Sequence, residues 1–154
     1  MFLPVRTIVV IAFLTVAGVG PAQAAERDFA AEEANRKLVV DFYDRFFNKH
    51  ETVEAAEVVA EDYKQHNPNV PDGKAPFVGF FTKFLKDNPE RKSRIVRSAT
   101  DGDLVYLHVH SIESPKDRGV AVVDIFRVKD GKIVEHWDVI QKVPEQSAND
   151  NTMF

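Results

Sequence analysis

Residues 130–138 read DGKIVEHWD, and this stretch decides the fold class. The Asp130-Gly131 pair is typical of a tight turn, and the apolar run that follows is typical of a β-strand. Because successive side chains of a strand point to opposite faces, His136 and Asp138 share one face. An imidazole and a carboxylate are costly to bury unless they are paired or hydrogen-bonded. The stretch therefore predicts a strand that lines a polar pocket.

The segments before this strand predict helices first and then a sheet. Spacings of three and four between apolar residues predict helices near 28–48, 52–60 and 74–88, with a loop between the last two. An alternation of period two predicts four strands near 92–100, 103–113, 119–129 and 132–143. Short turns between successive strands imply an antiparallel meander. We therefore expect an α+β domain whose helices cover one face of the sheet.

The last hairpin has two possible registers. A three-residue turn with Gly131 in a bulge position would pair Val128 with Lys132 and place Asp124 on the face of His136. A two-residue turn would place Asp124 on the opposite face. We favour the three-residue turn.

Strand 103–113 carries a second polar pattern. Its alternation places Tyr106, His108 and His110 on one face, and we expect this face to be the one that the helices cover, together with His136 and Asp138. Seven apolar side chains would then stay uncovered on the other face: Val105, Leu107, Val109, Val123, Ile125, Trp137 and Val139. Such a patch usually marks an interface, so we predict a homodimer packed through the helix-free face of the sheet.

A metal centre is the alternative use of these histidines. His108 and His110 could supply two imidazoles, with His136 or Asp138 completing a three-ligand set. The chain has no cysteine and lacks the helical histidine motifs of zinc enzymes, so we expect no metal. It also lacks a nucleophile elbow, a phosphate-binding loop and a dinucleotide fingerprint.

The first 24 residues have the pattern of a signal peptide. A short basic start precedes the apolar run 7–19, and Ala22-Gln23-Ala24 has the small-x-small form of a cleavage site. An uncleaved anchoring helix is the alternative. We expect cleavage near Ala24 and a periplasmic or secreted product, with residues 25–154 as one domain. The formal net charge of −4 and the lack of a basic stripe argue against nucleic acid and anionic membranes as partners.

Two motifs resemble a known family. Residues 63–68 read YKQHNP and residues 126–138 read FRVKDGKIVEHWD. Together with the order of helices and strands, they look like the SnoaL-like, polyketide-cyclase-like branch of the NTF2-like superfamily, over essentially all of residues 25–154. The resemblance implies a cone-shaped fold with a pocket between the helices and a concave sheet, and frequent dimers. In the family's cyclases an Asp and a His move protons during an intramolecular aldol closure without a cofactor.

The resemblance also implies roles for individual residues. Asp138 matches a pocket carboxylate of related enzymes, and His108 and His110 lie on a strand that supplies a further catalytic residue in several of them. We predict these three residues as catalytic and expect no cofactor. The residues predicted to bind substrate are Tyr63, His66, Phe81, Tyr106, Asp124 and His136.

Two hypotheses of function remain open from the sequence. One is a cofactor-independent acid–base enzyme for a small carbonyl compound, of the aldol, isomerase or hydrolase type. The other is an exported ligand-binding or assembly domain without catalysis, since this fold hosts both.

Overall fold

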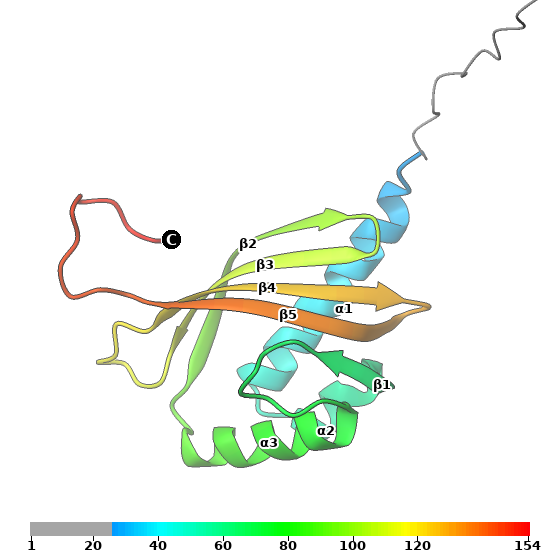
Figure 1. Ribbon diagram of the computed structural model, residues 1–154, viewed down its shortest axis with the longest axis horizontal. Coiled ribbons are helices and arrows are strands. Elements are labelled where there is room, and N and C mark those ends of the chain that lie inside the picture. Colours follow the sequence, from blue (N-terminus) through cyan, green and yellow to red (C-terminus); the bar gives the residue numbers. More distant parts are fainter. Residues whose placement is uncertain (1–25) are drawn as a thin grey trace, which may run out of the picture.

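A curved sheet with helices on one face makes up the part of the chain that the structure describes, residues 26–154 of a computed structural model (Figure 1). The helices are α1 (Phe29–Phe47), α2 (Thr52–Ala55), the 3₁₀ turn η1 (Ala56–Val58) and α3 (Lys74–Asp87). The strands are β1 (Val59–Gln65), β2 (Lys92–Asp101), β3 (Leu104–Ile112), β4 (Val120–Lys129) and β5 (Lys132–Lys142). The predicted α+β fold class is confirmed.

The strand order of the sheet is β1-β5-β4-β3-β2. Strands β2 to β5 form the predicted antiparallel meander. Strand β1 was not predicted: the expected helix to residue 60 ends earlier, and Val59–Gln65 pairs in parallel with β5. Only Val59 and Tyr63 of this strand are buried apolar residues, so its sequence shows no clear alternation. The backbone groups of β5 supply its hydrogen-bond partners, and this pairing continues to His66, whose N–H donates to the carbonyl of His136.

Helix α1 crosses behind the sheet in Figure 1, and α2 and α3 lie at the bottom of this view, below β1. Asp28 caps α1 by accepting a hydrogen bond from the backbone N–H of Ala31 at 2.9 Å. The buried face of α1 packs on aliphatic and aromatic side chains of the sheet. This core includes Val39, Phe42, Phe46, Val105, Leu107, Val109, Phe126, Val128 and Ile133.

The register of β3 against β4 corrects the face prediction. Leu107 pairs with Asp124, and Val105 pairs with Phe126, so the aliphatic side chains of β3 face the helices. His108 and His110 therefore lie on the opposite, helix-free face, and the prediction that they share the face of His136 is wrong. Alternation divides the side chains of a strand into two sets but does not say which set is buried. Aliphatic side chains fill the core without needing the hydrogen-bond partners that imidazoles require.

The β4–β5 hairpin places Asp124 on the face of His136, as expected, although its turn differs from the predicted one. Asp130 and Gly131 both have positive φ, 51° and 71°, and form a two-residue turn in which Lys129 pairs with Lys132. The predicted three-residue turn is therefore wrong. An extra residue, Val134, bulges from β5 and restores the parity, so the next pairs along the hairpin do bring both carboxylates to one face. These pairs are Phe126 with His136 and Asp124 with Asp138.

The bulge also turns Ile133, which pairs with Val128, into the core. Among residues 26–154, no helix is long and apolar enough to cross a membrane. The predicted signal peptide lies outside the described residues.

Glu32 joins the start of α1 to the β2–β3 hairpin. Its side chain is only 4% exposed and accepts hydrogen bonds from the guanidinium of Arg27, the hydroxyl of Thr100 and the backbone N–H of Gly102. These bonds favour the charged carboxylate and lower its pKa from 4.5 to about 2, with the hydrogen bond from Arg27 as the largest cause.

This shift predicts a pH-dependent loss of stability. Because the folded pKa is depressed, the contribution of Glu32 is fully present above pH 4.5 and is lost as the pH falls toward 2. The variant Glu32→Gln should melt at a lower temperature than wild type at pH 7, and this difference should shrink between pH 4.5 and 2. Glu33→Gln, which removes an exposed ion pair with Arg36, is the control and should change less. If Glu32→Gln melted below wild type by the same number of degrees at pH 7 and at pH 2, this would contradict the role of Glu32.

Candidate active site

A cavity of about 210 Å³ lies between the helices and the covered face of the sheet. Its apolar wall comes mainly from α1 and α3 and includes Phe47, Phe77, Phe80, Phe81 and Phe84. Its polar lining includes Tyr43, Tyr63, Gln65, Asn67, Arg91, Asp124, His136 and Asp138. Polar groups that converge in an apolar cavity are the general mark of a ligand site.

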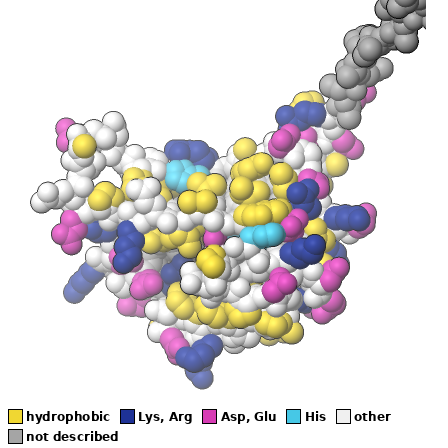
Figure 2. All heavy atoms as spheres, in the orientation of Figure 1, with side chains coloured by type: hydrophobic (Ala, Val, Ile, Leu, Met, Phe, Trp, Pro, Cys, Tyr) yellow, Lys and Arg dark blue, Asp and Glu magenta, His cyan; other side chains and the backbone are white. Residues whose placement is uncertain are grey.

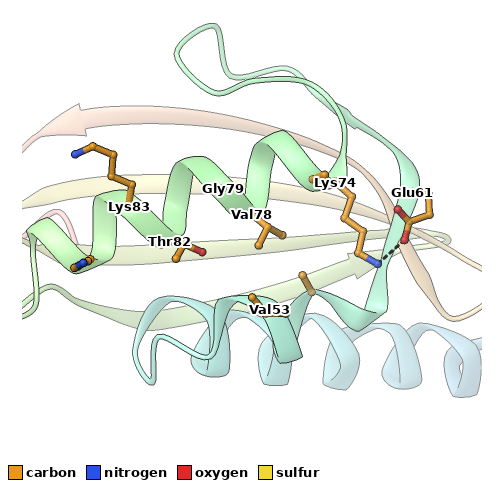
Figure 3. Close-up of a pocket in the computed structure, with 10 residues that line it drawn as sticks. Val53, Glu61, Lys74, Val78, Gly79, Thr82 and Lys83 are labelled. Atoms are coloured by element: carbon orange, nitrogen blue, oxygen red, sulfur yellow. Dashed lines mark hydrogen bonds and ion pairs between the residues drawn. The ribbon is translucent and has the colours of Figure 1, made fainter.

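A larger depression of about 650 Å³ lies between α2 and α3 (Figure 3). Val53 and Val78 line it, and its ion pair joins Lys74 to Glu61 at 2.7 Å. It contains no histidine and only one carboxylate. We therefore take the cavity over the sheet as the candidate site, because it brings two carboxylates and an imidazole together with an aromatic wall.

A chain of hydrogen bonds crosses the polar side of the cavity. The Oε1 atom of Gln65 accepts a hydrogen bond from the backbone N–H of Asn67 at 2.9 Å, which fixes the orientation of the Gln65 amide. The same oxygen is 2.9 Å from Nδ1 of His136, so Nδ1 must carry a proton and donate it. On the other side of the ring, Nε2 lies 3.0 Å from Oδ1 of Asp124. The second oxygen of Asp124 accepts from the hydroxyl of Tyr43 at 3.0 Å.

This geometry places one shared proton between His136 and Asp124. Because Nδ1 is already protonated, the contact at Nε2 holds either an imidazolium beside a carboxylate or a neutral imidazole beside a carboxylic acid. The pair has no net charge in either form. Both residues are buried, so neither would be stable there as an unpaired ion.

Asp138 stands apart from this pair. Its Oδ2 accepts from the amide nitrogen of Asn67 at 2.6 Å, and the amide orientation is fixed because Oδ1 of Asn67 accepts from the backbone N–H of Asn69 at 2.8 Å. Among the described residues, Asn67 is the only one whose side chain hydrogen-bonds this carboxylate. Asp138 is half-buried and lines the cavity, so it can accept a proton from a bound molecule.

The comparisons with known proteins agree with this architecture. Residues 37–147 match the family described as SnoaL-like polyketide cyclase. The chain belongs to this family. No curated protein matches it.

Solved structures share the fold of this SnoaL-like protein at low sequence identity. A candidate ketosteroid isomerase from Kribbella flavida is 20% identical, with a TM-score of 0.61 over 77% of this chain and 85% of that one. A SnoaL-like protein of unknown function from Burkholderia thailandensis is 13% identical, with a TM-score of 0.62 over 71% and 96%. A candidate polyketide cyclase from Bacillus cereus is 24% identical, with a TM-score of 0.58 over 70% and 74%.

Five of the residues predicted for the site line the cavity of the SnoaL-like protein: Tyr63, Phe81, Asp124, His136 and Asp138. Three others, Tyr106, His108 and His110, belong to the helix-free face. There His108 accepts from Arg97 at 2.8 Å, and His110 donates to the carbonyl of Arg118 at 2.9 Å. Their predicted role in this cavity is wrong, because the sheet lies between them and the acid–base groups.

His66 is also outside the cavity. Its ring stacks on Trp137, with ring centroids 4.7 Å apart, and its Nε2 lies 2.9 Å from a carboxylate oxygen of Glu135. Its neighbours Gln65 and Asn67 line the cavity instead, and neither was predicted as a site residue. Tyr63 and Gln65 are spaced by two, so recognising β1 as a strand would have placed both on one face, with Asn67 two residues beyond its end.

The metal alternative takes a new form in the structure. His108 and His110 cannot join His136, but Asp124, His136 and Asp138 offer ligand atoms within 4.8 Å of one another. Of these atoms, Nε2 of His136 already shares a proton with Asp124. The arrangement works as a hydrogen-bonded set without an ion, and the expectation that no metal is needed stays a prediction.

Two buried tyrosines remain neutral donors in this site. Burial, together with the nearby charge of Asp124, raises the pKa of Tyr43 well above 10. Burial likewise raises the pKa of Tyr63, with Asp124 and Asp138 as further causes. The hydroxyl of Tyr63 accepts from the amide nitrogen of Gln65 at 3.2 Å.

The two tyrosines form a matched pair for a stability test. Tyr43→Phe removes a hydrogen bond to a buried, charge-bearing pair, and we expect it to lower the free energy of unfolding by about 1.5–3 kcal/mol. Tyr63→Phe removes a bond between neutral groups and should lower it by about 0.5–1.5 kcal/mol. Urea unfolding followed by circular dichroism measures both. Equal losses in the two variants would mean that Tyr43 does not support the Asp124–His136 pair.

Proposed function

We propose that this SnoaL-like protein is a cofactor-independent acid–base enzyme that acts on a small carbonyl compound in the aromatic cavity. One observation carries the proposal. The Asp138 carboxylate faces the cavity beside the Asp124–His136 pair, which holds its own proton and has no net charge. Family membership supports the coarser statement that the chain belongs to a family that processes small molecules.

We assign each step of the proposed reaction to a residue of the cavity. Asp138 removes a proton from the carbon α to a carbonyl, and the carbonyl oxygen gains negative charge. The hydroxyl of Tyr63 accepts from Gln65, and its own proton has no acceptor within residues 26–154, so it can donate to that oxygen. Its raised pKa keeps it protonated. A donor aimed at developing charge is usually the largest contribution to such a reaction.

The size of the cavity limits the ligand. At about 210 Å³ it is smaller than the roughly 300–1,000 Å³ of common ligand sites. This volume favours a short-chain or single-ring carbonyl compound over a multi-ring polyketide.

A ligand-binding protein without catalysis is the second candidate function. The aromatic wall, which would hold an apolar ligand, and the predicted export favour it. The two functions differ in one property. Only the enzyme exchanges the α-protons of its ligand with solvent.

Asp138→Asn tests the enzyme. In deuterated water, ¹H NMR would follow α-deuterium incorporation into a panel of small ketones and aldehydes. We expect the variant to lose a factor of about 10²–10⁴ in the enzyme-catalysed rate, the usual contribution of a general base. Its melting temperature should stay within a few degrees of wild type, since Asn preserves the shape of Asp138.

Asp62→Asn is the control for this experiment, because Asp62 is an exposed carboxylate of β1 outside the cavity. It should leave the rate unchanged. Exchange that is equally fast in wild type and Asp138→Asn would exclude Asp138 as the base. Binding of panel members without any catalysed exchange would favour the ligand-binding function.

We also propose that the chain is exported and forms a homodimer through the helix-free face of the sheet. Figure 2 shows hydrophobic side chains gathered over the strands on this face, with histidines among them. Val123 and Val139 are paired across β4 and β5 and are 42% and 70% exposed. Because Val105, Leu107 and Val109 belong to the core, the patch is smaller than the sequence suggested.

The dimer can be tested by charging this surface. Val123→Glu combined with Val139→Glu should halve the mass measured by light scattering at micromolar concentration, since two facing sheets would bury four like charges. Val53→Glu, which alters an exposed valine of α2, is the control and should leave the mass unchanged. A monomeric wild-type protein would exclude the dimer.

A further inference from the structure

Arg91 is a charged residue of the cavity that the proposed reaction does not use. It follows α3 and precedes β2, and its side chain is only 17% exposed. The Nε atom is buried and has no hydrogen-bond acceptor within residues 26–154. A buried donor on a permanent cation costs free energy when it is left without a partner.

The contacts that Arg91 does make leave much of its charge uncompensated. One Nη atom lies 3.9 Å from a carboxylate oxygen of Glu113, whose side chain is 62% exposed, so this pair is long and screened by solvent. The guanidinium also lies over the ring of Phe84, 5.0 Å from its centroid. Neither contact satisfies Nε.

The sheet register places Arg91 beyond the acid–base groups. Lys92, the next residue, pairs with Ile112 at the end of the sheet where β4 begins. Between that end and the Asp124–Asp138 pair lies the cavity-lining pair Val122–Ile140, one two-residue step or about 7 Å along the strands. The cavity therefore has a carboxylate base toward one end, apolar side chains between, and a guanidinium toward the other end.

The charges of the cavity also favour an anion near Arg91. Because Asp124 and His136 together carry no net charge, Asp138 and Arg91 are the two uncompensated charges of the lining. A guanidinium can bind a carboxylate through two parallel hydrogen bonds, and Arg91 is among the residues that line the cavity. The apolar pair Val122–Ile140 separates such a carboxylate from Asp138.

From these observations we infer that the cavity takes a small carbonyl compound that also bears a carboxylate, and that the guanidinium of Arg91 binds this carboxylate. This inference rests on the proposed function for the role of the carbonyl group. Arg91 is thus a specificity-determining residue that orients the ligand, with its carbonyl end toward Asp138.

Binding to matched acids and esters tests the inference without any need for turnover. Isothermal titration calorimetry would compare levulinate, 5-oxohexanoate and 4-oxo-4-phenylbutanoate, in which two or more methylene groups separate the carbonyl from the carboxylate, with their methyl esters. We expect wild type to bind at least one of the acids about tenfold or more tightly than its ester, as a charge-assisted bidentate contact implies. Arg91→Gln should remove this preference while changing ester affinity less than about twofold, and Arg91→Lys should keep only part of it.

Glu113→Gln is the matched control, because it removes the other ionic contact of Arg91 and leaves the guanidinium in the cavity. It should keep or increase the preference for acids. Melting temperatures show whether each variant is folded. If Arg91→Gln does not fold, Arg91→Lys takes its place in the comparison. The inference is overturned if no acid of the panel binds, or if Arg91→Gln weakens acid and ester equally. The proposed function fails on a different result, the unchanged deuterium exchange of Asp138→Asn.

Discussion

Asp124 of β4 and Asp138 of β5 are paired directly across the strands, and the polar half of the site depends on how their repulsion is relieved. Side chains in such a pair have Cβ atoms about 5 Å apart, so two charged carboxylates there destabilise the sheet. His136 and Tyr43 relieve the repulsion by binding both oxygens of Asp124. The proton shared with His136 removes the net charge on that side and leaves Asp138 as the free carboxylate. The two acids therefore have different roles because their neighbours differ.

Strand β1 supplies the neutral groups that keep this arrangement in place. Its parallel pairing with β5 brings Gln65 opposite His136, so that the glutamine oxygen can fix the proton of Nδ1. The backbone N–H groups of Asn67 and Asn69 then fix the orientations of the Gln65 and Asn67 amides. Every amide in the network is thereby oriented by a backbone donor that cannot change its role. Loss of the β1–β5 pairing would release the imidazole and Asp138 together.

The sequence predicts the residues of β4 and β5 well and those of β1 and β3 poorly, for physical reasons. His136 and Asp138 are two residues apart, so any strand places them on one face. Asp124 joins them only because Val134 bulges from β5, a backbone feature that no side-chain pattern announces. For β3, both faces contain enough apolar residues to be buried, and the packing against α1 decides between them.

The site residues of the YKQHNP segment show the same limit. The histidine is the residue that attracts attention in this motif, yet it stacks on Trp137 outside the cavity. Gln65 and Asn67 are ordinary amides whose importance comes from the position of β1 beside β5. Arg91 follows a helix end, where nothing in the sequence separates a cavity residue from a solvated one. Local periodicity identifies faces, whereas long-range pairing decides which polar residues meet.

The distribution of charge along the cavity explains why an acid–base site can exist in so apolar a space. A single unpaired carboxylate among phenylalanines would take up a proton instead of acting as a base at neutral pH. Here Asn67 donates to Asp138, and the guanidinium of Arg91 supplies positive charge within the same lining. The lining therefore offers this carboxylate a hydrogen-bond donor and a balancing cation in place of the water that the phenylalanines exclude. A ligand that places a carboxylate on Arg91 would bring its carbonyl end toward Asp138, so the guanidinium that offsets the charge of this acid would also orient the ligand.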